Sequence, residues 1–388
     1  MRLPKFSELS EEQLDVCQAP LDGTTIVIGP PGSGKTVVAL FRRSTAEKLG
    51  AQTGVVVYNN VLQVYTGTGR TFYRWLAAWW RSITGVAYPT LESAPNSTWR
   101  QPDFGSMIGS LVNRYRDAAL RRGHWGHLII DEAQDFGREA HALLANVPTL
   151  VFGGLDTPDR PSITILADDN QRITSDNSTI ADIVRLHQLT EEDVYRLRQN
   201  YRNTREIASV AALFFVGTTS GIPAQPERRG NKPSLVRTDD VDDAVARIAS
   251  HARGHPEHEI GVLVQYTSMR KKLFNKLNHR LRNSGVRVQT FGSGDDANGL
   301  AFDTPGVVTV LTFASSKGLE FDAVFLPELQ ATDFSSGSAD VARMTLYVMC
   351  SRAREALTLL VSDDGRRSGE IWRYLPNEPR LSQLFELS

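Results

Sequence analysis

The sequence predicts an α/β fold with two domains, each a mostly parallel β-sheet covered by helices on both faces. Apolar, strand-like runs alternate with helical stretches along the chain, and this alternation is typical of parallel sheets with crossover helices. The chain has 388 residues, too many for one ordinary domain and enough for two domains that each bury a core. A glycine-rich loop between the first predicted strand and the helix after it also favours such a fold.

The first domain is expected to span residues 1–195, with a short insertion at about residues 86–123, and the second domain residues 196–388. The strands of the first domain are predicted from runs rich in β-branched residues, at 24–28, 55–58, 127–130 and 162–166. Those of the second domain are predicted at 234–237, 260–265, 286–289, 307–311, 323–326 and 357–361, with helices at 241–252 and 269–283.

The composition, with 41% hydrophobic and 22% charged residues, is that of an ordinary globular protein. The 43 Lys and Arg residues nearly balance the 44 Asp and Glu residues, so the formal net charge is −1. Any binding of nucleic acid must therefore use a local basic groove. The chain has no apolar signal core near its beginning and no run of about 18 apolar residues, so we expect neither export nor membrane insertion. Cys17 and Cys350 are expected to be buried free thiols in a reducing cytoplasm.

Residues 29–36 read Gly-Pro-Pro-Gly-Ser-Gly-Lys-Thr and match the complete G-x-x-x-x-G-K-[ST] phosphate-binding loop. The loop follows a strand and precedes a helix, so its backbone N–H groups and the helix N-terminus would face a phosphate. Lys35 would reach the β- and γ-phosphates, and the hydroxyl of Thr36 would hold Mg²⁺. The alternative is a glycine-rich turn that only closes a βα unit. We predict nucleoside triphosphate binding by the whole loop: Gly29, Pro30, Pro31, Gly32, Ser33, Gly34, Lys35 and Thr36.

Two adjacent acids follow another apolar strand, at the start of the sequence Asp-Glu-Ala-Gln-Asp at residues 131–135. Open α/β sheets bind their ligands at the carboxyl ends of their strands, where these acids would lie. Asp131 is suited to hold Mg²⁺ through its hydration shell, and Glu132 can polarise the water that attacks the γ-phosphate. On their own, such acids are more often a solvated loop or a helix N-cap. Together with the phosphate loop, they predict ATP hydrolysis.

The order of the motifs resembles that of a superfamily 1 helicase of the UvrD/Rep type. Besides the phosphate loop and the acidic sequence, the motifs lie at residues 9–13, 169–173, 200–202, 312–321 and 346–354. The resemblance covers nearly the whole chain. It implies two RecA-like motor domains, with ATP and Mg²⁺ bound in the cleft between them.

The resemblance also implies roles for residues around the nucleotide. Gln13 would read the adenine edge through its amide, and Tyr201 would stack against the base. Gln171 would sense the γ-phosphate and couple hydrolysis to movement. Glu320 would contact the ribose or organise the neighbouring arginines.

Two arginines, Arg202 and Arg352, resemble those that reach from the second domain to the γ-phosphate. A planar guanidinium suits the oxygens of a transferring phosphoryl group. Outside these motifs, each arginine would ordinarily be interpreted as an exposed surface charge.

Motors of this family move 3′ to 5′ along single-stranded DNA, which implies DNA contacts from both domains. Hydroxyl and basic groups would hold phosphates, and aromatic faces would stack bases without sequence preference. The aromatic run at 72–80 has an alternative interpretation as a helix that packs its rings, including Trp75 and Trp79, into the core. The predicted contacts are Asn59, Asn60, Thr71, Phe72, Thr312, Ser315 and Lys317.

Several positions depart from the family pattern. Residues 172–175, after Gln171, supply no aromatic platform for a base. Ala314 replaces the histidine before the Lys-Gly-Leu-Glu sequence, and Ala167 or Asp168 replaces the usual glycine of the sensor loop. The regions in which family members carry accessory subdomains are short. We therefore expect a compact motor with complete ATP chemistry and a reduced grip on DNA.

Three functions agree with these features. The first is an ATP-dependent translocase or helicase on single-stranded or tailed DNA. The second is the same activity on RNA, because stacking and phosphate contacts tolerate either sugar. The third is a helicase-like ATPase subunit that regulates a partner, such as a nuclease in a bacterial defence system, with little unwinding of its own.

Overall fold

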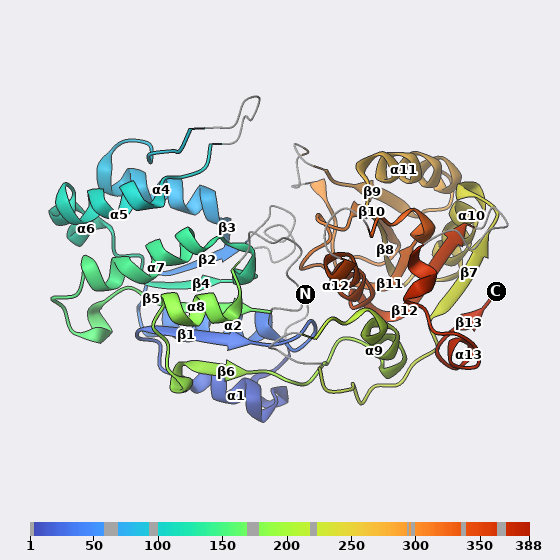
Figure 1. Cartoon of the computed structure of the whole chain (residues 1–388), viewed down its shortest axis with the longest axis horizontal. Coiled ribbons are helices and arrows are strands. Elements are labelled where there is room, and N and C mark those ends of the chain that lie inside the picture. The colour runs from blue at the N-terminus through green and yellow to red at the C-terminus, as the bar shows by residue number, and fades with distance from the viewer. Residues whose placement is uncertain are drawn as a thin grey trace.

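The computed structural model describes residues 4–57, 69–92, 100–168, 178–217, 223–292, 295, 299–334, 339–362 and 370–388. It has the predicted α/β architecture. Two β-sheets, whose named strands all pair in parallel, form two separate bodies joined by the chain that leads from β6 to α9 (Figure 1). Each sheet has helices on both faces, as expected for two RecA-like domains.

The first sheet has the strand order β3-β2-β4-β5-β1-β6. Its central strands are short apolar runs buried on both sides, which is typical of parallel strands covered by helices. Edge strands β3 and β6 are shorter and more exposed. The strands are β1 (Thr24–Ile28), β2 (Thr53–Val57), β3 (Arg70–Thr71), β4 (His127–Ile130), β5 (Ser162–Ala167) and β6 (Val194–Arg196).

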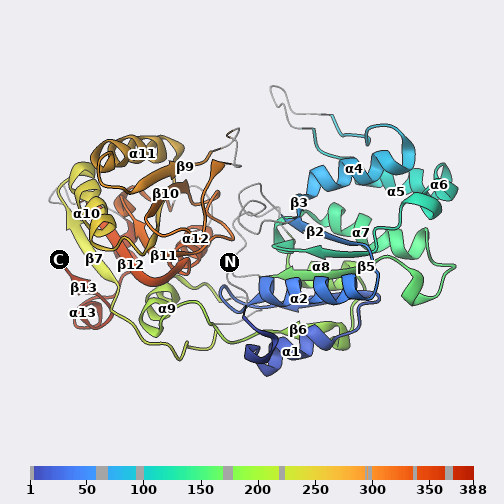
Figure 2. The same ribbon diagram turned by 180° about the vertical axis from the view of Figure 1, so that it is seen from behind.

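Alternate residues of each central strand pack against opposite helical layers. Val27 and Ile129 share a core with α1 and α2, whereas Ile26 and Leu128 pack against α4, α5 and α7. Figure 2 shows α2 in front of the sheet, and Figure 1 shows α7 and α8 in front from the opposite side. The helices are α1 (Glu11–Gln18), α2 (Lys35–Lys48), α4 (Phe72–Thr84), α5 (Phe104–Asn113), α6 (Arg116–Arg122), α7 (Arg138–Leu150) and α8 (Ile180–Leu186).

The second sheet has the strand order β13-β7-β12-β11-β8-β10-β9. Its strands are β7 (Ser234–Thr238), β8 (Glu259–Val264), β9 (Arg287–Thr290), β10 (Val307–Thr312), β11 (Phe321–Leu326), β12 (Ala353–Ser362) and β13 (Glu386–Leu387). Helices α10 and α11 cover one face, and α9 and α12 cover the other. The helices are α9 (Arg205–Ala211), α10 (Val241–Gly254), α11 (Thr267–Leu281), α12 (Ala339–Cys350) and α13 (Arg380–Leu384).

The junction between the two domains was predicted after residue 195. Strand β6 still pairs with β1 at Arg196, and Ile207 of α9 is buried in the core of the second sheet. We therefore propose that the first domain ends between these two residues. The predicted insertion at 86–123 contains α5 and α6, which pack on α4 and α7 rather than forming a separate subdomain.

Helix α4 turns its aromatic face into the first core, so the prediction that Phe72 contacts nucleic acid is wrong. Phe72 is 0% exposed, and its ring centroid lies 4.9 Å from that of Phe136. Trp79 is also buried and donates a hydrogen bond from Nε1 to the carbonyl of Gly123 at 2.8 Å. The alternative interpretation of this run as a core helix is the correct one.

Cys17 and Cys350 are both buried free thiols. Among the described residues, none of the helices has the length and apolar character needed to cross a lipid bilayer.

Candidate active site

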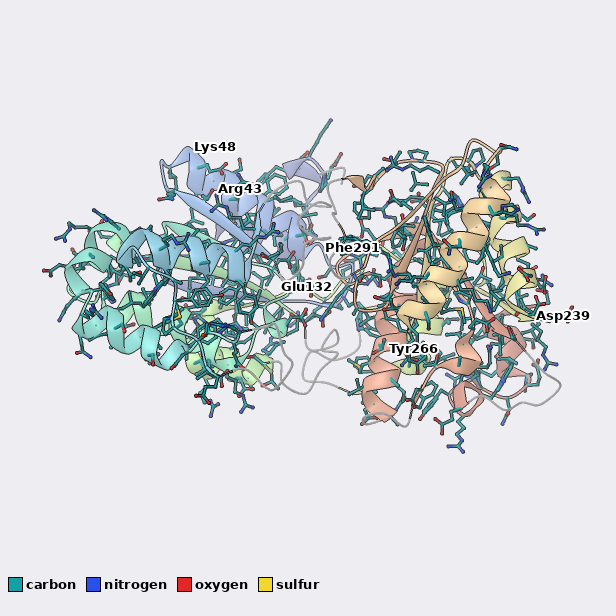
Figure 3. The ribbon with its side chains drawn as sticks, turned by 90° about the horizontal axis from the view of Figure 1, so that it is seen from above. Arg43, Lys48, Glu132, Asp239, Tyr266 and Phe291 are labelled. Atoms are coloured by element: carbon teal, nitrogen blue, oxygen red, sulfur yellow. The ribbon has the colours of Figure 1, made fainter. Side chains whose placement is uncertain are left out.

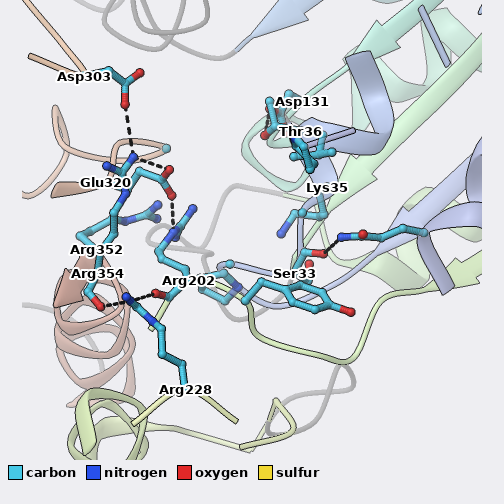
Figure 4. Close-up of a pocket in the computed structure, with 18 of the residues that line it drawn as sticks. Ser33, Lys35, Thr36, Asp131, Arg202, Arg228, Asp303, Glu320, Arg352 and Arg354 are labelled. Atoms are coloured by element: carbon cyan, nitrogen blue, oxygen red, sulfur yellow. Dashed lines mark hydrogen bonds and ion pairs between the residues drawn. The ribbon is translucent and has the colours of Figure 1, made fainter. Parts of the chain in front are cut away.

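A cleft of about 620 Å³ lies between the two domains. One wall consists of the phosphate loop and the carboxyl end of β4, and the other of residues just before α9 and the amino ends of β11 and β12. Figure 3 shows Glu132 near the centre of the molecule, where the first domain faces the second. Figure 4 shows Lys35 and Asp131 on one side of the cleft and Arg202 and Arg352 on the other.

The phosphate loop has the backbone shape that its glycines predict. Gly32 and Gly34 have φ values of 81° and 87°, in the left-handed region that favours glycine. A Cβ atom on Gly34 would lie 2.3 Å from Gln13 Nε2. Ser33 Oγ is buried and has no hydrogen-bond partner among the described residues, as expected for a loop whose polar groups are directed at a ligand.

Lys35 is buried against its own loop. Its Nζ donates to the carbonyls of Gly29 at 2.6 Å and Pro30 at 3.2 Å, and lies 3.8 Å from Asp168 Oδ2. These contacts hold the ammonium at the mouth of the loop, where a triphosphate could replace the two carbonyls.

Thr36 and Asp131 form the polar pair expected at a magnesium site. Thr36 Oγ1 donates to Asp131 Oδ2 at 3.2 Å. Burial and the neighbouring charge of Glu132 raise the pKa of Asp131 to about 6, and a cation beside the carboxylate would favour its ionised form. A hydroxyl and a carboxylate next to a phosphate-binding loop are the oxygen ligands that Mg²⁺ takes. The residues present therefore fit this metal.

Glu132 is held in an unusual conformation at the end of β4. Its φ of 53° lies in the left-handed region, where a non-glycine residue is strained, and such strain is common at active sites. Gln134 Nε2 donates to Glu132 Oε2 at 2.6 Å. Burial alone would raise the pKa of Glu132, but the charges of Lys317 and Lys35 outweigh it and lower the pKa. A buried, ionised carboxylate facing the cleft is suited to polarise a water molecule.

The opposite wall centres on Glu320, which binds two arginines. Arg202 Nε donates to Glu320 Oε2 at 2.5 Å, and Arg354 Nη2 donates to Glu320 Oε1 at 2.7 Å. Burial opposes ionisation, but these two guanidinium groups lower the pKa of Glu320 to about 2. Arg202 Nη1 is buried and has no partner among the described residues. Glu320 thus holds two guanidinium groups of this wall in place.

Arg352 is 1% exposed and lies beside this group. Its Nη1 donates to the carbonyl of Leu319 at 3.3 Å. Burial and the nearby charge of Arg202 lower its pKa to about 10, so it remains charged at neutral pH. Asn203 Nδ2 donates to the carbonyls of Ser351 and Ala353, at 3.1 and 2.5 Å, and thereby fixes the backbone on both sides of Arg352.

The two predicted adenine contacts line the same cleft. Tyr201 is 46% exposed, which leaves its ring face available for stacking. Gln13 Oε1 accepts from the backbone N–H of Ser10 at 3.1 Å, and its Nε2 donates to the carbonyl of Ser33 at 3.1 Å. Gln13 therefore links the start of α1 to the phosphate loop.

The predicted nucleic-acid contacts are dispersed. Thr71 ends β3, and Thr312 and Ser315, at the end of β10, bond each other through their hydroxyls at 3.0 Å. Lys317 is buried in an ion pair with Asp135 of the first domain. The prediction that it holds a nucleic-acid phosphate is therefore wrong for this structure, because its ammonium is enclosed between the domains. Asn59, Asn60 and Gln171 lie outside the described residues.

Two arginines of the cleft were not predicted from the sequence. Arg354 lies two residues after Arg352 in the same motif, and its charge in that motif was an available signal. Arg228 Nη2 donates to the carbonyl of Arg202 at 2.6 Å and also to that of Arg354. It lies in a segment without a recognisable motif, so only the fold reveals its place.

Comparison with known proteins identifies helicase families over both domains. Residues 23–292 match the family described as Schlafen group 3, DNA/RNA helicase domain. Residues 307–360 match the UvrD-like helicase C-terminal domain. The prediction of a helicase-like protein is confirmed at this level.

Individual relatives are distant. The RecBCD enzyme subunit RecB of Chlamydia pneumoniae is 33% identical over 82 residues, which are 20% of this chain and 8% of that protein. The chain thus spans only a small part of this relative's length. A solved C-terminal domain of a possible DNA helicase from Lactobacillus plantarum is 22% identical, covers 48% of this chain and 98% of that chain, and has a TM-score of 0.33. Because the match at residues 23–292 covers more than half of the chain, the protein belongs to the Schlafen group 3 DNA/RNA helicase domain family.

Proposed function

We propose that this protein is a compact ATP-driven motor of the superfamily 1 UvrD/Rep type that moves 3′ to 5′ along single-stranded DNA. The observation that carries the proposal is the composite cleft. A phosphate loop with two buried acids on one domain faces a group of arginines on the other.

In this proposal, the first domain binds ATP and prepares the attacking water. Lys35 leaves its loop carbonyls for the β- and γ-phosphates, and Glu132 polarises the water. Thr36 and Asp131 would hold Mg²⁺, which neutralises charge on the β- and γ-phosphate oxygens when it is bound. Tyr201 stacks on the base.

The second domain completes the site with its arginines. The unpartnered Nη1 of Arg202 and the buried charge of Arg352 would stabilise the charge that develops on the transferring phosphoryl group. This works only while the cleft is closed, so the γ-phosphate favours closure and its loss favours opening. Gln171 would report the γ-phosphate to the rest of the motor.

The track would lie across both domains. Thr71, Thr312 and Ser315 carry partly exposed hydroxyls that could hold phosphates, and Asn59 and Asn60 would add to them. The balanced charge of the whole chain requires that such binding be local. The matched family is described for both DNA and RNA, so RNA is the alternative track.

A second candidate is an ATPase subunit that regulates a partner such as a nuclease. The observation that favours it is that two of the residues predicted to contact nucleic acid, Phe72 and Lys317, are buried. The RecB relative is itself named as a subunit of a larger enzyme. In this alternative, closure of the same cleft would drive the partner.

The first test is the rate of ATP hydrolysis with and without single-stranded DNA or RNA. The motor proposal expects stimulation by an oligonucleotide; an unchanged rate with both would favour the regulatory alternative. Lys35→Ala should abolish hydrolysis, whereas Lys48→Ala, an exposed lysine at the end of the same helix, should not. Normal hydrolysis by Lys35→Ala would overturn the assignment of the cleft.

Polarity requires a second experiment. Displacement of a fluorescent strand should depend on a 3′ single-stranded tail. Equal displacement from 5′-tailed and 3′-tailed duplexes would contradict the proposed direction. Stimulated hydrolysis without displacement would indicate translocation without strand separation.

A further inference from the structure

Three histidines gather at the amino edge of the second sheet, in a cluster that the ATP cleft does not use. His251 lies in the last turn of α10, and His255 and His258 lie in the turn that leads to β8. The backbone N–H of His258 donates to the carbonyl of His255 at 3.1 Å. This turn brings the two rings together, with their centroids 4.8 Å apart and their planes inclined by 12°.

Two carboxylates lie within the same cluster. Glu257 Oε1 is 3.3 Å from His255 Nδ1 and 3.7 Å from His258 Nε2. Glu355 Oε2, from β12, is also 3.7 Å from His258 Nε2. The ligand atoms of His255, Glu257 and His258 all lie within 4.8 Å of one another.

These separations are close to those of a tetrahedral metal centre. Nitrogen and oxygen atoms bonded to zinc at 2.0–2.2 Å lie about 3.4 Å from one another. Small side-chain rotations would therefore bring His255, Glu257 and His258 into coordination, and Glu355, which approaches this cluster through His258, would have to turn towards the other ligands to complete the set. Two imidazoles with two carboxylates favour zinc and similar transition metals over Mg²⁺ and Ca²⁺, which prefer oxygen ligands alone.

The surroundings also favour a cation. His251 Nε2 lies 3.2 Å from His258 Nδ1, whereas the two carboxylates approach the other ring nitrogen of His258, Nε2. A hydrogen bond at this position is what orients a metal-binding histidine. The cluster also lies at the C-terminus of α10, where the helix dipole attracts positive charge.

We propose that His255, Glu257, His258 and Glu355 bind one transition-metal ion of the zinc class, with His251 as the residue that positions His258. This site uses none of the residues assigned to ATP hydrolysis. It adjoins the cleft nevertheless, because Glu355 lines the cleft and its Oε1 lies 3.7 Å from Arg228 Nη1. Arg228 in turn holds the backbone carbonyls of Arg202 and Arg354. A bound metal would therefore share one side chain with the arginine wall.

The test is calorimetric titration of the untagged full-length chain, stripped with a chelator, with ZnCl₂ in excess MgCl₂. We expect one zinc ion per chain and, with CoCl₂ instead, the intense visible absorption of four-coordinate cobalt. The double variant His255→Ala/His258→Ala should lose this binding. The matched control is His279→Ala, an exposed histidine of the same domain outside the cluster, which should retain it.

Two further variants separate the roles. His251→Ala should keep the stoichiometry and weaken the affinity by about 10- to 100-fold, the effect of removing an orienting hydrogen bond. Glu355→Gln should weaken binding as well, and unchanged affinity would overturn its place in the site and the link to the cleft. The absence of saturable zinc binding, or its persistence in the folded double variant, would overturn the whole proposal. His255 and His258 are 47% and 13% exposed, and circular dichroism should show that the double variant keeps its fold.

Discussion

At the scale of single residues, the cleft depends on charges that are buried and held in place by their partners. Glu320 is the main example, since one carboxylate binds Arg202 and Arg354 through its two oxygens. Bonding at Nε leaves the far end of the Arg202 guanidinium available to a phosphate. Asn203 holds Arg352 in place through hydrogen bonds to the backbone carbonyls on both sides of it. In the proposed motor, the arginines are thus positioned before a nucleotide binds, which reduces the ordering that binding must bring about.

Replacement of Arg352 tests its role across the cleft. Arg352→Ala should slow ATP hydrolysis by about a thousandfold or more, the effect of losing an arginine finger, while nucleotide affinity changes little. Arg352→Lys should be nearly as slow, because an ammonium lacks the planar fork. Single-turnover hydrolysis and binding of a fluorescent ATP analogue measure the two effects. Arg253→Ala, an exposed arginine in the last turn of α10, is the control, and normal hydrolysis in Arg352→Ala would place this residue outside the reaction.

Gly34 offers a test of the phosphate loop itself. Alanine at this position is strained by about 1–2 kcal/mol because φ is positive, and its Cβ would displace the amide of Gln13. Gly50→Ala has a similar φ of 82° and nothing within 4 Å of the new Cβ. Both variants should lose similar stability in urea unfolding. ATP affinity should fall only in Gly34→Ala, by about tenfold for roughly one hydrogen bond. Equal ATP affinity in both variants would show that the Gln13 contact does not matter.

Much of the cleft could be predicted because its residues occur in motifs of fixed order. The loop glycines, Lys35 and Glu132 belong to such motifs, and the structure brings them to one cleft. Arg228 could not be predicted, because its position depends on a long-range backbone contact that leaves no local sequence pattern. Lys317 was predicted to hold a nucleic-acid phosphate because it is a basic residue in the same motif as Thr312 and Ser315, whereas the fold encloses it between the domains.

At the scale of elements, helix α4 shows how burial decides between two interpretations of one sequence. Rings spaced three and four residues apart suit both a core face and a row of stacking platforms. Phe72, Trp79 and Trp80 all lie in the core of the first domain. Phe72→Ala should therefore cost about 3–5 kcal/mol of unfolding free energy. Arg74→Ala, on the exposed side of the same helix, should stay within about 0.5 kcal/mol. If Phe72→Ala kept normal stability but its ATP hydrolysis were no longer stimulated by an oligonucleotide, Phe72 would have a role in nucleic-acid binding after all.

Helices α7 and α8 meet at two histidines, of which His141 is buried and His187 half-buried, and this pair should make the first domain sensitive to acid. His141 Nδ1 lies 3.3 Å from His187 Nε2. Burial lowers the pKa of His141 to about 4 and that of His187 to about 3, from 6.5. A lowered pKa in the folded state means that the unfolded chain binds the proton first. The stability contributed by neutral histidines is present above pH 6.5 and is lost as the pH falls towards 4.

The measurement is urea unfolding at pH about 7 and about 5. Between these two pH values, one such histidine should lower the free energy of unfolding by roughly 2 kcal/mol. His187→Asn should reduce this difference. His279→Asn, an exposed histidine, should leave it unchanged. An equal loss of stability in wild type and His187→Asn would assign the acid sensitivity to other groups.

The central strands could be predicted from sequence, whereas the shortest edge strands could not. β1, β4 and β5 are apolar runs of at least four residues, a signal strong enough to fix their limits within about one residue. β3, β6 and β13 have only two or three residues, and such short strands exist because a neighbouring strand is already in place.

At the scale of the whole molecule, a buried ion pair links the two domains in addition to the chain that connects them. Lys317, between β10 and β11, makes an ion pair with Asp135, just after β4, and their side chains are 5% and 2% exposed. Burial raises the pKa of Asp135 to about 6 even with Lys317 beside it. A buried ion pair contributes little net stability, but loss of one partner is costly. This contact therefore favours the closed arrangement only while both charges are present.

Lys317→Met should open the cleft. The loss of a buried partner costs about 3–5 kcal/mol, and because the pair spans two domains, separation of the domains relieves this cost without unfolding either one. Small-angle scattering should show a larger radius of gyration, and ATP should bind more weakly.

The control is Lys276→Met, which breaks the exposed pair with Asp242 inside the second domain. It should change neither the radius nor ATP binding, since such pairs contribute at most about 1 kcal/mol. Addition of Asp135→Leu to Lys317→Met should restore the compact form by removing the buried carboxylate. An unchanged radius in Lys317→Met would show that other contacts set the domain arrangement.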